Sequence, residues 1–270
     1  MDTLVSAGDH RLHLMTVGEG SPAVVLDVGF GDSPAGWQAV IDRIAAHTRV
    51  VSYERAGLGR SEPGPLPRTP ERAAGELVEA LRSAGIEPPC VFVGHSLGAL
   101  NLLLLGARYP ELAVGLLLVS PPPLAFLAGR EFPELRAEAD SLSARLDREA
   151  AAAEASSDPG VRAGAPRLRA LASEHAMMFS TGAEQAGGIE TLGDLPVTVI
   201  AAGNANPDFG AVAFRFQELW IAENARLAEL STRGRFLLAR SGHRVHREAP
   251  DLIVREVIAM VDSVRAGAAE

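Results

Sequence analysis

The stretch from residue 90 to residue 99, Cys-Val-Phe-Val-Gly-His-Ser-Leu-Gly-Ala, decides how the rest of the chain is interpreted. A short apolar run at 91–93 leads into Gly94-His95-Ser96-Leu97-Gly98, and an apolar segment of helical character follows at 99–109. A strand, a tight turn and a helix in this order hold a nucleophilic serine in the Gly-x-Ser-x-Gly pattern. The turn projects the serine hydroxyl away from the sheet, and a Cβ at either glycine would crowd the neighbouring strand and helix. We therefore expect Ser96 to be a nucleophile.

Composition limits the class of protein. The chain has 270 residues, of which 47% are apolar and 22% charged, as expected for one large domain with room for an inserted subdomain. A net charge of −9 and the lack of a basic run argue against a nucleic-acid partner. Cys90 stands alone, so no internal disulfide is expected. The N-terminus lacks a signal-peptide pattern, and the apolar runs are too short to span a membrane. We expect a cytoplasmic protein without a membrane partner, monomeric or homodimeric, that acts on a small molecule.

Several cofactor chemistries are excluded by residue type. All 25 basic residues are arginine, and without lysine the chain cannot form a Schiff base, bind pyridoxal phosphate through an internal aldimine or build a Walker-type P-loop. The pairs His10/His13 and His243/His246 have no carboxylate or cysteine partner at ligand spacing, so no metal is expected. The glycine pairs near residues 30 and 58 lack the third glycine of a dinucleotide site. No cofactor is therefore predicted.

Strands alternate with helices along most of the chain, which predicts a doubly wound, mostly parallel sheet. Strands are expected at 3–7, 11–17, 23–28, 49–53, 91–93, 114–119, 196–201 and 235–239, and helices at 35–46, 69–84, 99–109, 212–230 and 248–264. The region 124–194 breaks the alternation, because it is rich in Ala, Glu and Arg and carries only helical segments, at 133–155, 166–178 and 182–191. We interpret 124–194 as a helical cap between strands six and seven of a core formed by 1–123 and 195–270.

Four loops are expected to meet on one rim of this sheet. Ligands of open α/β sheets bind beyond the carboxyl ends of the strands. Ser96, the loop at 29–33, the loop at 204–208 and His243 each follow a predicted strand directly. These segments should therefore gather at one site.

Taken in order, the motifs resemble those of the α/β-hydrolase superfamily, in its serine-nucleophile branch with a helical cap. The matching segments are Gly29-Phe30-Gly31 ahead of Trp37, the Arg55–Ser61 loop, residues 94–98 and Ser241-Gly242-His243. The resemblance implies the α/β-hydrolase fold, with His243 as the base that activates Ser96. It also implies an oxyanion hole formed by the N–H groups of Leu97 and Phe30.

The orienting acid is where the chain departs from the family pattern. The loop after strand seven usually reads Gly-x-x-Asp, but here it reads Gly203-Asn204-Ala205-Asn206-Pro207-Asp208. Asparagine occupies the expected place, so we favour Asp208 as the acid and keep Asn206 as the alternative. Some relatives supply the acid after strand six, where this chain has Ser120.

Three functions remain open from the sequence. The first is a serine hydrolase of a small, largely apolar ester, lactone or thioester, acting through an acyl-enzyme on Ser96. The second is a cofactor-free, non-hydrolytic enzyme on the same scaffold, such as a lyase or cyclase of secondary metabolism. The third is a binding protein with a weakened triad. The residues considered for the substrate pocket, against the alternative of ordinary packing, are Trp37, His175, Met178 and Phe179.

Overall fold

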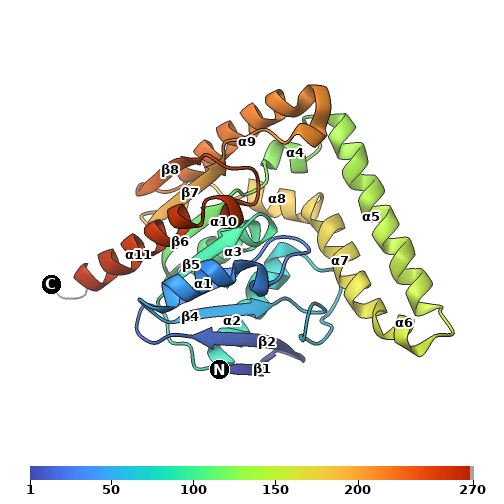
Figure 1. Ribbon diagram of the computed structural model, residues 1–270, viewed down its shortest axis with the longest axis horizontal. Coiled ribbons are helices and arrows are strands. Elements are labelled where there is room, and N and C mark those ends of the chain that lie inside the picture. The colour runs from blue at the N-terminus through green and yellow to red at the C-terminus, as the bar shows by residue number, and fades with distance from the viewer. Residues whose placement is uncertain (268–270) are drawn as a thin grey trace.

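The computed structural model describes residues 1–267 and contains an eight-stranded sheet in the order β1-β2-β4-β3-β5-β6-β7-β8 (Figure 1). Strands β1 and β2 pair antiparallel, as do β2 and β4, and all later pairs are parallel. This confirms the predicted doubly wound, mostly parallel sheet. The strands are β1 (Asp2–Ala7), β2 (His10–Val17), β3 (Val24–Asp27), β4 (Val50–Glu54), β5 (Cys90–His95), β6 (Ala113–Val119), β7 (Val197–Ala202) and β8 (Gly234–Ala239).

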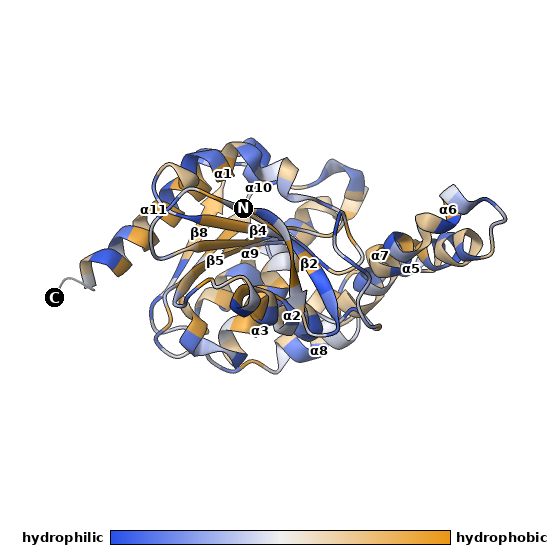
Figure 2. Cartoon of the chain, turned by 90° about the horizontal axis from the view of Figure 1, so that it is seen from below, coloured by the Kyte–Doolittle hydropathy of each residue, from blue (hydrophilic) through white to orange (hydrophobic). Residues whose placement is uncertain are grey.

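Helices cover both faces of the sheet, as Figure 2 shows with the apolar central strands between two helical layers. Successive residues of a strand point to opposite faces. In β5, Val91 and Val93 therefore join the core under α1 and α11, whereas Phe92 joins the core under α2 and α3. The helices outside the β6–β7 connection are α1 (Gln38–Ala45), α2 (Pro70–Ser83), α3 (Leu97–Arg108), α9 (Ala213–Ala228), α10 (Val245–Glu248) and α11 (Pro250–Gly267), with 3-10 turns η1 (Pro34–Trp37), η2 (Pro110–Leu112) and η3 (Pro207–Val212).

Helix boundaries follow local signals. At the start of α2 the Thr69 side chain accepts a hydrogen bond from the Arg72 N–H at 3.2 Å, and Pro70 takes the first helical position, as predicted. The predicted start of the helix expected at 248–264 is wrong. The chain instead forms the short α10 and then begins α11 at Pro250, because proline has no N–H to continue the preceding helix.

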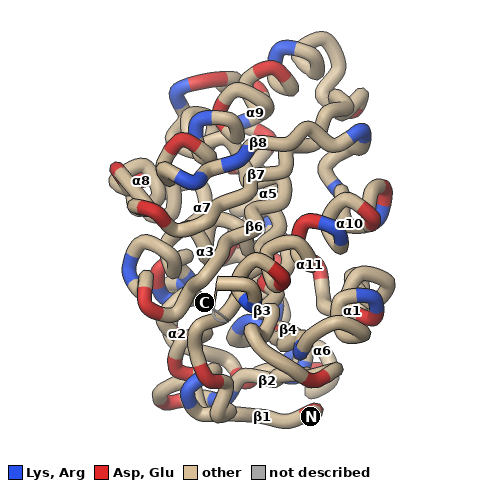
Figure 3. Tube along the Cα trace, turned by 90° about the vertical axis from the view of Figure 1, so that its left-hand side faces the viewer, with Lys and Arg blue, Asp and Glu red and all other residues tan. Residues whose placement is uncertain are grey.

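The connection between β6 and β7 contains helices and no strand over residues 124–187. It comprises α4 (Leu124–Leu127), α5 (Pro133–Glu154), α6 (Pro159–Ala163), α7 (Ala165–Met178) and α8 (Thr181–Gly187), which we call the α4–α8 segment. Figure 1 shows α5 and α7 running side by side out to α6, away from the C-terminal end of α11. Charged residues of both signs lie along helices such as α1 and α9 (Figure 3). The central strands β5, β6 and β7 contain no Lys, Arg, Asp or Glu.

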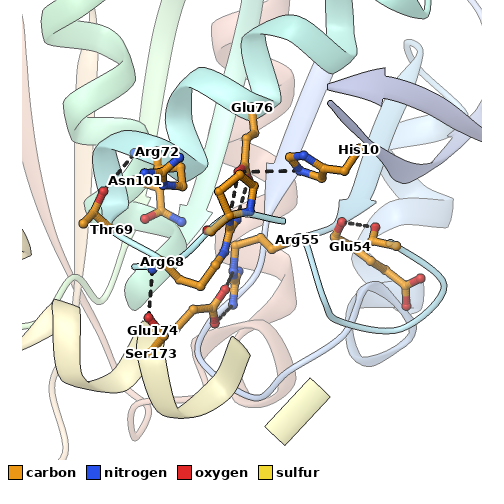
Figure 4. Close-up of polar contacts among 12 residues, drawn as sticks. His10, Glu54, Arg55, Arg68, Thr69, Arg72, Glu76, Asn101, Ser173 and Glu174 are labelled. Carbon is orange, nitrogen blue, oxygen red and sulfur yellow. Dashed lines mark hydrogen bonds and ion pairs between the residues drawn. The ribbon is translucent and has the colours of Figure 1, made fainter. Parts of the chain in front are cut away.

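A buried ion cluster joins this segment to the sheet (Figure 4). Arg55 follows β4 and is 3% exposed. Its Nη1 donates to Asp27 Oδ1 at the end of β3 at 2.8 Å, and its Nε donates to Glu174 Oε1 on α7 at 2.7 Å. Beside it, the backbone N–H of Arg68 donates to the Ser173 hydroxyl of α7 at 2.8 Å. Two loops of the sheet therefore hold α7.

Most polar atoms of this cluster have hydrogen-bond partners within it or in the adjacent backbone. Asp27 is fully buried, and its Oδ2 also accepts from the Tyr53 hydroxyl at 2.8 Å and from the Asn101 amide at 2.9 Å. The remaining Arg55 N–H groups donate to the carbonyls of Val28 and Gly29, at 2.6 and 3.2 Å. The carboxylates of Glu174 and Asp27 raise the pKa of Arg55 against the opposing effect of burial, so its charge is kept.

Candidate active site

Ser96 lies in a sharp turn between β5 and α3. Its backbone has φ 53° and ψ −118°, a conformation that non-glycine residues adopt only when the surroundings enforce it. The Ser96 N–H donates to the Val119 carbonyl of β6 at 3.0 Å, which fixes the turn. A Cβ at Gly94 would lie 2.7 Å from the Ala99 Cα, and one at Gly98 would lie 2.2 Å from the Asp27 carbonyl oxygen. Both glycines are therefore required by close approach, for the reason expected from the sequence.

His243, in the loop after β8, faces this serine. Its Nε2 lies 3.1 Å from Ser96 Oγ, the arrangement in which the serine hydroxyl donates to a neutral imidazole. His95 supports the loop from inside the elbow, because its Nε2–H donates to the His243 carbonyl at 2.9 Å. The Gly242 N–H donates to Glu248 on α10 at 2.8 Å. The structure thus brings Ser96 and His243 together and holds the histidine from both sides.

The second ring nitrogen of His243 meets a hydroxyl. Nδ1 lies 3.0 Å from the Oγ of Ser120, the residue that follows β6. Ser120 is fully buried, with φ 47°, and its N–H donates to the Ile200 carbonyl of β7 at 2.6 Å. Within residues 1–267, no carboxylate is hydrogen-bonded to His243.

The acid expected from the loop after β7 is not brought to His243. Asp208 and Asn206 are both exposed, and the Asn206 side chain accepts from the Asp208 N–H at 3.1 Å. This cap, with Pro207 behind it, begins η3 and turns the loop toward the α4–α8 segment, where Phe209 lines a cavity. Ser120, the residue after β6, lies next to the imidazole of His243 instead.

The surroundings of His243 favour its neutral form. Protein atoms packed around the ring lower the pKa of His243 below its usual range, an effect that the solvent exposure of this residue weakens. His95, His246 and Arg244 lower it further, because each is a cation or becomes one on protonation. The ring of Trp220 on α9 packs edge-on against it at 5.1 Å. His243 is therefore available as a base at neutral pH.

A second cluster, of Asp32, His95 and His246, lies behind the elbow. Among the 267 described residues, these three have potential metal-ligand atoms that all lie within 4.8 Å of one another. Asp32 Oδ2 lies 3.3 Å from His246 Nε2, a partner that sequence spacing alone missed. The guanidinium of Arg247 lies 3.3 Å from that same nitrogen and 3.5 Å from Asp32 Oδ1. Arginine already supplies the cation at this place, so the cluster acts as a support for the elbow.

The loop at 29–33, which we call the oxyanion loop because the sequence predicts a donor in it, lies against the elbow. A Cβ at Gly29 would lie 2.8 Å from His95 Nδ1 and 3.3 Å from the Ser96 Cβ, so the backbone beside Phe30 approaches the serine closely. Leu97 is the first residue of α3, where N–H groups have no partner inside the helix. Of the two predicted donors, Leu97 therefore follows Ser96 directly in the chain, and Phe30 belongs to a loop that lies close to Ser96 in space.

A cavity of about 880 Å³ lies within the α4–α8 segment, among α4, α5 and α7, and Phe209 of η3 also lines it. His175 and Phe179 line it, and the His175 ring also packs against Phe30 at 5.0 Å, which links the cavity to the oxyanion loop. Met178 is buried in the core, and Trp37 stacks on His246 at 4.4 Å on the other face of the sheet. The large apolar side chains that line it are Phe126, Leu135, Leu142, Phe179 and Phe209.

A serine at a strained turn between a strand and a helix, a histidine after the last strand and a helical segment between β6 and β7 are features of the α/β-hydrolase class. The Alpha/beta hydrolase family matches residues 24–256, and the chain belongs to this family. The uncharacterized protein YqjL of Bacillus subtilis is 23% identical over 87% of this chain and 82% of its own length. A putative carbamate hydrolase, RutD of Klebsiella pneumoniae, is 41% identical, but the match covers 37% of this chain and 38% of that protein.

The solved structures agree with this fold. The enol-lactonase of Burkholderia xenovorans LB400 superposes with a TM-score of 0.68 at 20% identity, covering 96% of this chain and all of that one. At this identity the likeness concerns the fold. No helix within residues 1–267 combines the length and apolar character that a membrane crossing requires.

Proposed function

We propose that this α/β hydrolase is a serine hydrolase that cleaves small, largely apolar esters, lactones or thioesters through an acyl-enzyme on Ser96. The observation that carries the proposal is the 3.1 Å contact between Ser96 Oγ and His243 Nε2 at a strained elbow. Relatives named as an enol-lactonase and a putative carbamate hydrolase support acyl chemistry on this scaffold. In this proposal residues 124–194 form a cap over the core of 1–123 and 195–270, and the cavity that His175 and Phe179 line receives the apolar part of the substrate.

The steps follow from the positions of the two side chains. His243 Nε2 takes the proton of Ser96 as Oγ bonds to the acyl carbon. The oxyanion forms beside the N–H groups of Leu97 and Phe30, and each such donor contributes about 3 kcal/mol in the transition state. The leaving group departs with its bonding electrons, and the imidazolium gives up its proton to the leaving group or to solvent, so that Nε2 is free again. Water then attacks the acyl-enzyme, again giving its proton to Nε2, and Ser96 Oγ recovers that proton as the acid is released.

Covalent labelling tests the nucleophile directly. A fluorophosphonate probe is expected to add one label to the wild-type chain, at Ser96 by peptide mass spectrometry. The Ser96→Ala variant should take no label, whereas Ser263→Ala, which removes an exposed hydroxyl on α11, should label like the wild type. Absence of label from a folded wild-type chain would rule out the serine hydrolase.

The pH profile of kcat/KM tests His243 as the base. The group must be neutral to accept the Ser96 proton, and its pKa is lowered by the surrounding protein and by nearby His95, His246 and Arg244. Activity should therefore stay constant as pH falls through the ordinary histidine range, about 6.5, and decline only below it. An acid limb centred at or above that range would mean that the surroundings do not lower the pKa of His243, and the absence of any acid limb in the His243→Ala variant would be needed to assign the limb to this residue.

A non-hydrolytic, cofactor-free reaction on the same scaffold is the second candidate, and the hydroxyl of Ser120 in place of a carboxylate favours it. Turnover in ¹⁸O-labelled water separates the two candidates. Hydrolysis places one labelled oxygen in the carboxylic acid product, whereas a lyase or cyclase reaction leaves the product unlabelled.

A further inference from the structure

We infer that Ser120 is the positioning residue of His243, and that its hydroxyl makes release of the acyl group from Ser96 the slow step. The inference rests on the proposed function of Ser96. It specifies the substrate class as acyl compounds with a weakly basic leaving group, such as an enolate, a phenolate or a thiolate.

Ser120 is held rigidly in this position. Its N–H is bonded to β7, and the next residue, Pro121, accepts a hydrogen bond through its carbonyl from the buried Asn224 of α9 at 2.9 Å. With φ 47° and no solvent exposure, the side chain has little freedom to turn away from His243. The 3.0 Å contact from Ser120 Oγ to Nδ1 is therefore a built feature of the site.

A hydroxyl controls the imidazole less strictly than a carboxylate does. An ionised carboxylate can only accept a hydrogen bond, so it requires the proton on Nδ1 and leaves Nε2 free as the base. The Ser120 hydroxyl can either accept from Nδ1–H or donate to bare Nδ1. In the second case Nε2 carries the proton and cannot activate Ser96. Only part of the His243 population is then competent.

The charge that develops on His243 is also not compensated. The ionisable groups that face it are His95 of β5, His246 of α10 and the adjacent Arg244, all of which disfavour an imidazolium. The nearby carboxylate, Asp32, lies against His246 and Arg247. Replacing the triad carboxylate by a neutral group costs about 10⁴ in rate where this has been measured, so base catalysis here is weak.

Weak base catalysis affects the two half-reactions unequally. A carbonyl with a weakly basic leaving group is attacked readily, and the bond from acyl carbon to leaving group breaks without a proton from the imidazolium. The acyl-enzyme is always an ester of the Ser96 alkoxide, whatever the first substrate was. Its hydrolysis depends on general-base catalysis by His243, which removes a proton from water, so the acyl-enzyme is expected to accumulate.

Rapid mixing with p-nitrophenyl acetate tests this on the wild-type chain. The first turnover should release a burst of p-nitrophenolate close to one per site, followed by a steady rate at least tenfold slower, with acetyl on Ser96 by intact mass. Hydroxylamine, which needs no base to attack the acyl-enzyme, should raise the steady rate. Linear release from the first turnover, or no response to hydroxylamine, would overturn the inference while leaving Ser96 as the nucleophile. No acylation and no fluorophosphonate label would reject the proposed function itself.

Variants at position 120 separate positioning from packing. Ser120→Asp should raise the steady-state kcat at least tenfold, suppress the burst and raise the apparent pKa of the acid limb by one to three units, because an opposite charge favours the imidazolium. Aspartate tolerates the positive φ of this position. Ser120→Ala should lower kcat with little change in KM and keep the acid limb in place. If folded Ser120→Asp and Ser120→Ala both retain the wild-type kcat and pH profile, Ser120 does not position His243.

Discussion

Replacing Arg55 with methionine is expected to leave the chain largely unfolded at 25 °C. The guanidinium is the shared partner of two buried carboxylates, Asp27 and Glu174, which would both lose their ion pair at once. Removing one partner of a single buried pair costs about 3–5 kcal/mol. With two carboxylates stranded, the cost is comparable to the whole stability of a typical domain, about 5–15 kcal/mol. Urea unfolding followed by circular dichroism measures the loss.

Two further variants identify the cause. Arg55→Met combined with Glu174→Leu removes one stranded carboxylate together with its partner, and should recover part of the stability. Glu149→Ala, which removes the carboxylate of an exposed pair with Arg145 on α5, should change the free energy of unfolding by less than about 1 kcal/mol. A folded Arg55→Met chain of near wild-type stability would mean that the cluster is not needed to join α7 to the sheet.

One residue in the sequence points to this cluster, but it is easily overlooked because it lies within a segment interpreted as an apolar strand. Residues 23–28 read as one apolar run, yet Asp27 lies within it, and a carboxylate in a strand buried on both faces requires a partner. Arg55 belongs to the Arg55–Ser61 loop that matches the family pattern, but the sequence did not indicate that it pairs with Asp27. Glu174 could not be found in this way, because it lies on a helix 119 residues further along the chain.

The elbow turn and the place of His243 beside Ser96 could be predicted because their signals are local. Ser96 is defined by the strand and helix that adjoin it, and His243 by its place directly after the last strand. The partner of His243 depends instead on which of two loops turns inward. Asn206 and Pro207 are turn signals that indicate where the chain bends, but not the direction in which Asp208 then points. The structure gives the inward place to Ser120.

The pocket residues illustrate the same limit. His175 and Phe179 are four positions apart at the end of α7 and both line the cavity, whereas Met178, between them, is buried in the core and does not line it. Helical periodicity separates these faces only when the direction of the helix is known. Trp37 lies close in sequence to the oxyanion loop, but η1 carries it to the opposite face of the sheet.

Ser96→Ala, His243→Ala and the double variant are expected to lower kcat by one common factor, on the order of 10². In a serine hydrolase with a complete triad, losing all three residues costs about 2 × 10⁶ and losing the carboxylate alone about 3 × 10⁴, so a serine–histidine pair without its acid contributes roughly 10². Ser96 and His243 act in one proton transfer, across the 3.1 Å contact, so removing the second adds nothing to removing the first. Steady-state kinetics with a phenyl ester measures all three variants.

The size of this factor also measures what Ser120 contributes. A loss near 10⁶ would mean that the neutral hydroxyl supports His243 as well as a carboxylate does, and would contradict weak base catalysis at this site. Losses that multiply in the double variant would show that the two residues act in separate steps. In the Ser120→Asp background, where a carboxylate faces Nδ1, Ser96→Ala should cost at least tenfold more than in the wild type, because the hydroxyl it removes is then better activated.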